Sequence, residues 1–481
     1  MSTPNILFIL ADDMGAWALG CAGNSEIKTP NLDRLAARGV RLENAFCVSP
    51  VCSPARASLI TGRIPSAHGV HDWISRGSTV SKSSNDDSVL ITYMEGQSTY
   101  TDILAQNGYE VALSGKWHLG NSPQPQQGHG FWYVHAGGGS AYYNAPVIEN
   151  SEESTADQYI THAFTNKALD FLGQQKDSTT PFYLGVHYTA PHSPWEREQH
   201  PPEYFDPYFN ECPFESTPNE PMHPWQINSA PWGGRDPEFR REQLSGYYGS
   251  ITAMDADIGR LLEELERQGK LDNTIVVFTS DNGMNMGHHG IYGKGNGTYP
   301  QNMYDSSVKV PFIIAGPGIA GGHVSETLFS HYDFLPSLLA FVGLESKIPA
   351  GLPGQPLTEI WTGKPLERDE PLVVFDEYGP VRMIRNQRYK YVHRFEDFPC
   401  EFYDLESDPG ETNNCIDDPT YAVQVAALRG GLEDWFARYV IPEMDGAHLS
   451  VKGKGQLDRL DGPLGEKFAQ NWHYTKDQMA L

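Results

Sequence analysis

The sequence contains few cysteines, no long apolar run and no basic N-terminal segment. Six cysteines in 481 residues are too few and too scattered for a disulfide scaffold. The apolar run 5–11 is too short for the core of a signal peptide and ends in Asp12-Asp13, and no stretch is long enough to span a membrane. We therefore expect no membrane partner and a cytoplasmic location, or a periplasmic or secreted one if a leader has been removed.

Positive charge is also scarce. The chain has 35 lysines and arginines against 61 aspartates and glutamates, a formal net charge of −26. Such a field repels polyanions, which excludes nucleic acid as a partner, and an anionic ligand would have to be held by a local cluster of cations or a metal. With 39% hydrophobic and 11% aromatic residues, the chain can nevertheless bury a large core.

Short apolar runs alternate with helical patterns along the first three quarters of the chain. This alternation predicts an α/β fold with a large, mainly parallel or mixed sheet and helices on both faces. The clearest strands are expected at Asn5–Leu10, Glu110–Leu113, Phe182–His187 and Thr274–Thr279. The clearest helices are expected over 30–38, 240–268 and 331–342.

The composition changes twice along the chain. Residues 193–234 are rich in proline, tryptophan and tyrosine, which is typical of a lid or binding loop. After 366–371, four short strands and a helix over 421–439 predict a small antiparallel unit. We therefore expect a large α/β domain over residues 1–368 and a smaller α+β subdomain with a tail over 369–481.

Four polar segments each follow a predicted strand. They are Asp12-Asp13, Lys116-Trp117-His118, His192 and Asp281-Asn282. Because the carboxyl ends of parallel strands meet at one edge of a sheet, and ligands bind there, we expect these segments to converge.

Two of these segments carry only oxygen ligands. Three carboxylates (Asp12, Asp13, Asp281) packed beside Asn282 would repel one another unless a hard cation lay between them, which favours Ca²⁺ or Mg²⁺ over zinc. Either acidic pair alone is explained equally well as a helix cap. Two such pairs at neighbouring strand ends favour a metal.

The segment from Cys52 to Gly62 contains the strongest candidate for a reactive residue. Ser53 can cap a helix and Pro54 can occupy its first turn, which places Cys52 at a helix N-terminus. That position favours negative charge, so a thiolate nucleophile is one interpretation. A small buried side chain is the other.

The same segment resembles a known family signature. Cys-x-Pro-Ala-Arg over 52–56, followed by four residues and Thr61-Gly62, is similar to the signature of type I (formylglycine-dependent) sulfatases, in the alkaline phosphatase superfamily. Residues 108–118 resemble the second signature of that family, apart from Val111, where threonine is usual. Residues 388–391 and 403–411 resemble its C-terminal subdomain. The resemblance implies an alkaline phosphatase-like fold and a sulfuric ester hydrolase.

The resemblance also implies roles for individual residues. In that family a maturation enzyme oxidises the cysteine, here Cys52, to formylglycine, whose hydrate attacks sulfur. Ca²⁺ would be held by Asp12, Asp13, Asp281, Asn282 and an oxygen of residue 52. Arg56 would stabilise the hydrate, Lys116 and Lys294 would bind sulfate oxygens, His118 would take a proton from the hydrate, and His192 would contact sulfate and protonate the leaving oxygen.

Several other residues are weaker candidates. His289 lies between Asn282 and Lys294 in the sequence and is expected to contact substrate. Arginines in or after the long loop could bind a substrate carboxylate and its tryptophans could stack on sugars, although solvation of the arginines and hydrophobic anchoring by the tryptophans are the more common roles. These residues are Arg235, Arg240, Arg241, Trp195, Trp225 and Trp232. Cys47 is expected to pack in the core.

The predicted function is hydrolysis of a sulfate ester on a small molecule or glycan, with a carbohydrate sulfate favoured. A phosphomonoester or phosphonate hydrolase of the same superfamily is the first alternative, since it shares nearly all these charges. A non-catalytic sulfated-glycan-binding protein with unmodified Cys52 is the second, and an enzyme with an ordinary thiolate is the third. The sequence leaves open the oligomeric state and the position of the sulfate on the sugar.

Overall fold

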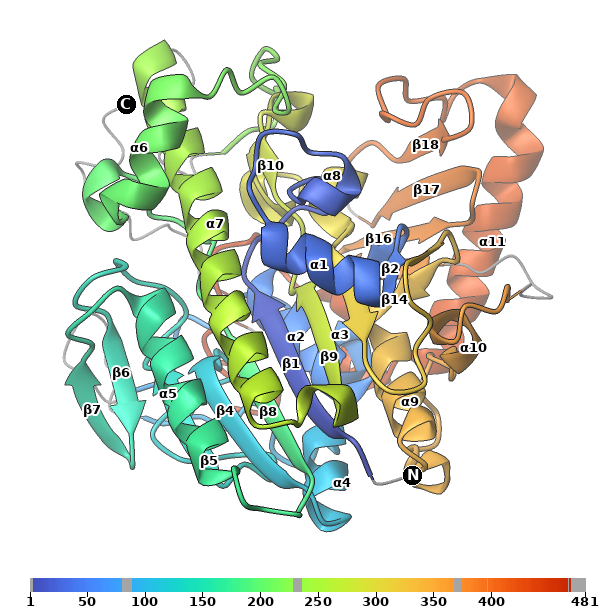
Figure 1. The fold of residues 1–481 in the computed structure, drawn as a ribbon. Coiled ribbons are helices and arrows are strands. Elements are labelled where there is room, and N and C mark those ends of the chain that lie inside the picture. The colour runs from blue at the N-terminus through green and yellow to red at the C-terminus, as the bar shows by residue number, and fades with distance from the viewer. Residues whose placement is uncertain are drawn as a thin grey trace.

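The computed structural model describes residues 3–79, 89–227, 236–366, 374–395, 397–465 and 467–468. Figure 1 shows a large sheet between layers of helices and, beside it, a smaller sheet with one long helix, α11. Within these ranges, no helix combines the length and the apolar character needed to cross a bilayer.

The large sheet has ten strands in the order β13-β2-β12-β9-β1-β8-β4-β5-β6-β7. Its strands are β1 Asn5–Ala11, β2 Val40–Leu42, β4 Glu110–Lys116, β5 Phe131–His135, β6 Pro146–Glu149, β7 Glu152–Thr155, β8 Phe182–His187, β9 Thr274–Ser280, β12 Phe312–Ala315 and β13 His323–Ser325. The five central strands from β9 to β5 are parallel, whereas β12, β6 and β7 pair antiparallel with their neighbours. The predicted mixed sheet is confirmed.

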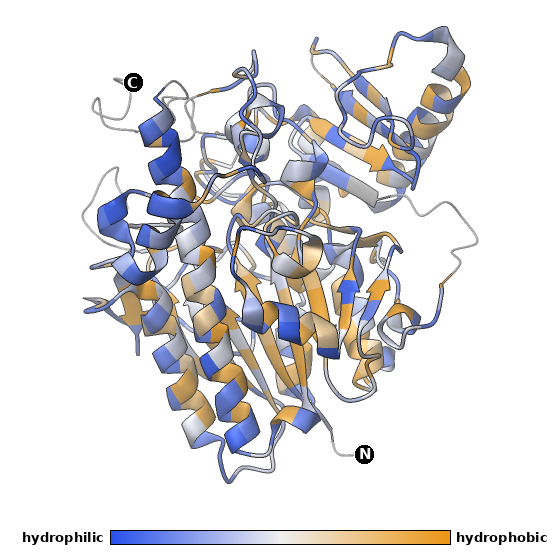
Figure 2. Ribbon diagram, turned by 45° about the horizontal axis from the view of Figure 1, so that its top comes forward, coloured by the Kyte–Doolittle hydropathy of each residue, from blue (hydrophilic) through white to orange (hydrophobic). Residues whose placement is uncertain are grey.

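Helices cover both faces of this sheet. Along β1, Ile6, Phe8 and Leu10 point into one core and Leu7, Ile9 and Ala11 into the other, as the two-residue period of a strand requires. The second core holds α1 Pro30–Arg38, α5 Ile160–Gln174 and α7 Pro237–Arg267, and the first holds α2 Cys52–Thr61, α4 Tyr100–Gln106 and α9 His331–Phe341. Figure 2 shows the apolar central strands between helices whose outer faces are hydrophilic.

The main elements agree with the sequence predictions. The predicted strand 182–187 has the same bounds as β8. The predicted helix 240–268 corresponds to α7, which begins three residues before the predicted start, at Pro237. The predicted loop over 193–234 contains the helix α6 Pro202–Glu211. Besides several 3-10 helices, the short elements include α3 Pro65–His68, α8 Asp305–Val308, α10 Thr358–Trp361 and the strand pairs β3 Ala45–Phe46 with β14 Phe329–Ser330 and β10 Asn285–Met286 with β11 Tyr292–Gly293.

The C-terminal part forms the predicted antiparallel sheet and helix. Its elements are β15 Val374–Tyr378, β16 Val381–Arg385, β17 Tyr389–Arg394, β18 Glu401–Asp404 and α11 Ala422–Tyr439. Asp305 of α8 joins it to the large domain, because its carboxylate accepts two hydrogen bonds of 2.7 Å from Arg385 Nη1 and one of 3.0 Å from Lys390 Nζ. The predicted boundary between residues 368 and 369 lies outside the described residues and stays a prediction.

The close pairing of β4 with β8 at the end of the two strands depends on Gly115. This residue has a φ of +133°, and a Cβ there would lie 1.9 Å from the carbonyl oxygen of His187. Only glycine tolerates both the backbone angle and the approach of the neighbouring strand. Because Lys116 follows directly and ends β4, Gly115 also determines where that ammonium group lies.

We expect Gly115→Ala to lower the free energy of unfolding by about 3 kcal/mol, from backbone strain and overpacking together. The measurement is urea unfolding of both proteins followed by circular dichroism. Gly173→Ala is the matched control: Gly173 lies exposed in α5 with nothing near its missing Cβ, so alanine should be neutral or stabilising by up to about 1 kcal/mol. Equal stability of the Gly115 variant and the wild type would show that β4 and β8 can separate at this point.

Candidate functional site

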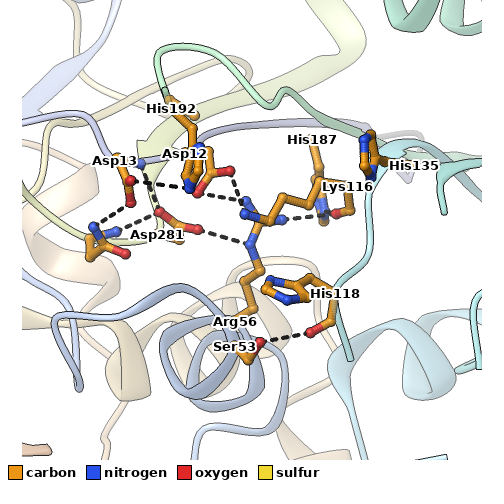
Figure 3. A network of polar contacts seen from close by, with 12 residues as sticks. Asp12, Asp13, Ser53, Arg56, Lys116, His118, His135, His187, His192 and Asp281 are labelled. Carbon is orange, nitrogen blue, oxygen red and sulfur yellow. Dashed lines mark hydrogen bonds and ion pairs between the residues drawn. The ribbon is translucent and has the colours of Figure 1, made fainter. Parts of the chain in front are cut away.

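The four polar segments converge as predicted. The neighbouring parallel strands β9, β1, β8 and β4 end at one edge of the sheet, and each is followed by one of the segments. Asp12, Asp281, Lys116 and His192 therefore meet there although they are far apart in the chain (Figure 3).

Three buried carboxylates form the centre of the site. Asp12, Asp13 and Asp281 each present an oxygen within 4.8 Å of the other two. Asp281 Oδ1 accepts hydrogen bonds from the backbone N–H of Asp13 (3.1 Å) and of Asn282 (2.8 Å). These two bonds fix the Asp281 carboxylate. Asp13, which donates one of them, has a left-handed backbone with a φ of +64°.

Each carboxylate is paired with its own buried cation. Lys116 Nζ lies 2.5 Å from Asp12 Oδ2, Lys294 Nζ lies 2.5 Å from Asp13 Oδ1, and Arg56 Nε lies 2.8 Å from Asp281 Oδ2. Burial alone would lower the pKa of Lys294, but the charge of Asp13 more than reverses this and raises it. Burial likewise opposes ionisation of Asp13, yet Lys294 and His192 hold its pKa below the usual range.

The donor set fits a hard divalent cation. Asp12 Oδ1 and Asn282 Oδ1 are buried and accept no hydrogen bond, while Asn282 Nδ2 donates to Asp13 Oδ1 over 2.9 Å. Burial, together with the charge of Asp281, raises the pKa of Asp12 to about 8, and a cation bound beside this carboxylate would favour its ionised form. Oxygen ligands in such a cluster suit Ca²⁺ or Mg²⁺. Asp12, Asp13, Asp281 and Asn282 can therefore hold such an ion together.

Cys52 is the first residue of α2 and is 4% exposed. Burial raises the pKa of its thiol, although the charges of Lys294 and Lys116 act in the opposite direction. A buried thiol with a raised pKa is a poor nucleophile, which argues against the enzyme with an ordinary thiolate.

The predicted cap by Ser53 is wrong. Val51 precedes the helix and makes no side-chain cap, whereas Ser53 Oγ donates to the carbonyl of His118 (3.0 Å) and accepts from the backbone N–H of Ile74 (3.0 Å). The hydroxyl thus ties the start of α2 to the segment after β4. These hydrogen bonds therefore hold the segments that carry Cys52 and His118 next to each other.

His118 is held neutral with one free nitrogen. Its Nε2 lies 3.0 Å from the carbonyl of Ile74, so Nε2 carries the hydrogen and donates it. Its Nδ1 is buried without a partner. Burial and the charge of Lys116 lower the pKa of the ring well below its usual value. Nδ1 is therefore an available proton acceptor.

His192 and His118 lie on opposite sides of the carboxylates (Figure 3). His192 Nδ1 donates to the carbonyl of Ser193 (2.7 Å), and His192 Nε2 lies 3.7 Å from Asp13 Oδ2. Burial lowers the pKa of His192 to about 4, against the opposing effect of Asp13.

The weaker candidates are placed elsewhere or serve the fold. Arg240 and Arg241 donate to backbone carbonyls of the 193–234 segment and fasten it to α7. Trp195 is buried and donates to the carbonyl of Pro191, which confirms its anchoring role. The ring of Trp225 lies 5.2 Å from the guanidinium of Arg394. Arg235 and Trp232 lie outside the described residues.

His289 stacks on Tyr304 with ring centroids 3.8 Å apart, so its contact with substrate stays a prediction. Cys47 is buried as expected, and all six cysteines are free. The sequence reasoning missed His187, whose Nδ1 lies 3.3 Å from the carbonyl of Lys116. Its position at the end of a predicted strand beside the site could have indicated it.

Comparison with known proteins identifies the family. Residues 4–344 match the sulfatase family, which is well over half of the chain, and residues 287–437 match the C-terminal part of N-sulphoglucosamine sulphohydrolases. The chain belongs to the sulfatase family. The alkaline phosphatase-like fold agrees with this, and the sulfatase is a sulfuric ester hydrolase.

Three similar proteins illustrate the family. The sulfatase is 28% identical to an N-acetylglucosamine-6-O-sulfatase of Bacteroides thetaiotaomicron, over 91% of this chain and 87% of the relative. It is 32% identical to an ulvan-active sulfatase of Formosa agariphila, over 87% and 78%. A solved structure in complex with its substrate D-glucosamine-2-N,6-O-disulfate superimposes with a TM-score of 0.76 at 25% identity, covering 93% of this chain and all (100%) of the other.

Adding Ca²⁺ to chelator-treated sulfatase should raise the free energy of unfolding, by about 2.7 kcal/mol at a Ca²⁺ concentration of one hundred times Kd. Asp281→Asn should remove most of this increment, because it removes one of the three carboxylates. The measurement is urea unfolding at a series of Ca²⁺ concentrations. Glu263→Gln, on the exposed side of α7, should keep the full increment. An unchanged increment in the Asp281 variant would place the ion elsewhere.

Proposed function

We propose that this sulfatase hydrolyses a sulfate monoester on a carbohydrate, using formylglycine formed from Cys52 and a Ca²⁺ ion held by Asp12, Asp13, Asp281 and Asn282. The observation that carries the proposal is the position of Cys52. It begins α2 within the electrostatic reach of two lysines and two of the carboxylates, Lys294, Lys116, Asp12 and Asp281.

Modification of Cys52 is supported by the state of the thiol. Burial raises the pKa of the thiol, so the unmodified side chain is a poor nucleophile, whereas the other charged groups of the site are in place. Formylglycine would supply a hydrated aldehyde as nucleophile, and Ca²⁺ would supply a Lewis acid beside it. A maturation enzyme acting on the unfolded chain is the implied partner, because Cys52 is buried in the folded protein.

The residues around Cys52 suit a reaction in which negative charge moves onto a leaving oxygen. Lys116 and Lys294 can neutralise the oxygens of a bound sulfate. Arg56 is fixed between Asp281 and the carbonyl of Lys116, to which its Nη1 donates over 2.8 Å, so it can hold the side chain at position 52.

The two histidines have opposite tasks. His118 accepts a proton at Nδ1, the nitrogen that the structure leaves free. His192 donates a proton to the leaving oxygen through Nε2. In the free site His192 is neutral at pH 7, since its pKa is about 4, and the negative charge of a bound sulfate ester would raise that pKa.

A carbohydrate substrate is supported by the relatives. One acts on N-acetylglucosamine 6-O-sulfate by its name, another on ulvan, and the solved structure holds a disulfated glucosamine. A 6-O-sulfated glucosamine is therefore the first substrate to test, with 6-phosphorylated glucosamine and a phosphonate monoester as the competing chemistry. The described residues contain one cluster that could hold a metal, Asp12 with Asp13 and Asp281. This favours a one-metal sulfatase over a two-metal phosphatase.

We expect Cys52→Ala to abolish turnover of 6-O-sulfated glucosamine while leaving the urea midpoint close to that of the wild type, because the position fills little volume. Cys47→Ala changes the other cysteine of the same peptide, which packs in the core and is not part of the carboxylate cluster, and this variant should remain active. Activity is measured as released sulfate in protein made with a formylglycine-generating enzyme.

Tandem mass spectrometry of the tryptic peptide 42–56 gives the second measurement. Replacement of sulfur by oxygen at residue 52, and not at Cys47, is the expected result. Full activity of Cys52→Ala, or a persistent thiol at residue 52 in active protein, would contradict the formylglycine proposal. A higher kcat/KM for the phosphate or phosphonate ester would favour the alternative hydrolase.

A further inference from the structure

A run of three glycines covers both histidines of the site. Residues 136–145 connect β5 to β6, and the backbone at Gly138 and Gly139 lies directly against the two rings. A Cβ at Gly138 would lie 2.2 Å from His118 Nε2, and a Cβ at Gly139 would lie 3.2 Å from His192 Cε1. Both rings therefore pack against backbone that has no side chain.

The loop is held by His135, the last residue of β5. Its Nδ1 accepts a hydrogen bond from the backbone N–H of Gly137 (3.0 Å), so Nε2 carries the hydrogen and donates it to Ser140 Oγ (2.8 Å). Ser140 in turn donates to the carbonyl of Ala141 (2.9 Å). His135 is buried and pairs with Lys116 across β4 and β5, which fixes the loop to the strand that carries a sulfate-binding candidate.

The far end of the loop returns to the same site. Tyr142 is buried, and its Oη donates to the carbonyl of His192 over 2.8 Å. Its backbone N–H donates to Gln199 Oε1 over 3.0 Å. His192 is thus contacted on its ring by Gly139 and on its backbone by Tyr142, and His118 is confined between Gly138 and the carbonyl of Ile74.

We propose that residues 135–142 are a positioning element for the sulfatase reaction, in which the bare backbone at Gly138 and Gly139 sets the orientation of the His118 and His192 rings and His135 locks that backbone in place. The inference deepens the proposed function, since it concerns how the proposed base and acid are aimed. Ring placement matters because an error of about 1 Å in a reacting group costs about 10²-fold in rate.

The three glycines form an internal test series. None of them has a φ in the left-handed region, so alanine is compatible with the backbone at each position. They differ in the space that a methyl group would meet: nothing lies within 4 Å at Gly137, the contact is 3.2 Å at Gly139, and it is 2.2 Å at Gly138. Any effect of alanine should therefore follow the distance to the histidine ring and not loop flexibility.

The experiment compares Gly137→Ala, Gly138→Ala and Gly139→Ala in full-length enzyme whose formylglycine content is equal by mass spectrometry. For a 6-O-sulfated glucosamine we expect kcat to fall about 10²-fold at Gly138, less at Gly139 and less than about twofold at Gly137, with KM changed much less than kcat at Gly138. Equal losses at Gly137 and Gly138, or no loss at Gly138, would overturn the inference.

His135 provides a second and independent test. Asparagine can still accept the hydrogen bond from Gly137, whereas leucine cannot, so His135→Asn should retain more kcat than His135→Leu. Equal kcat of the two variants and the wild type would overturn the role of His135. This comparison also applies if Gly138→Ala fails to fold.

Crystal structures of the glycine variants give a readout that does not depend on turnover. We expect the His118 ring to be displaced in Gly138→Ala and unmoved in Gly137→Ala. An unmoved His118 ring in Gly138→Ala would overturn the inference even if the wild type is an active sulfatase. A wild type that carries formylglycine but releases no sulfate from any ester would instead overturn the proposed function, and a displaced ring would then still support the positioning role.

Discussion

The site depends on the neutralisation of three carboxylates that are buried side by side. Uncompensated charges of this kind would cost several kcal/mol each, so the chain must bring a cation to every one of them. Those cations come from three separate places: Arg56 from α2, Lys116 from the end of β4 and Lys294 from the segment after β11. This balance of charges requires the observed order of the central strands, the close pairing of β4 with β8 at Gly115 and the packing of α2 on the sheet.

Sequence reasoning recovered this part of the molecule because its physics is local. A buried parallel strand is a continuous apolar run, and a charged pair at its end is visible in the sequence, so Asp12, Asp13, Asp281 and Asn282 could be assembled from strand topology alone. The family resemblance added Arg56, Lys294 and the roles of the two histidines. The short strands β2, β13, β6 and β7 were not predicted, since three or four residues show no clear period.

The errors and omissions share a different cause: each depends on a partner far away in the sequence. Ser53 has the residue type and position of a cap, but its hydroxyl is bonded to segments around residues 74 and 118 instead. The glycines at 138 and 139 resemble an ordinary flexible loop until the rings of His118 and His192 are placed against them. The stacking of His289 on Tyr304 likewise depends on a partner that its place in the sequence between Asn282 and Lys294 does not indicate, while its contact with substrate stays a prediction.

The one-to-one pairing of charges also bears on how a chain with a net charge of −26 can bind an anion. With all three carboxylates ionised, three positive and three negative side chains cancel, and the site offers no net attraction to a sulfate ester. A divalent cation among the carboxylates would leave the site with two net positive charges and would compete with Lys116 and Lys294 for the same oxygens. Cation and substrate binding should therefore be coupled, because the ion creates the local field that the protein as a whole opposes.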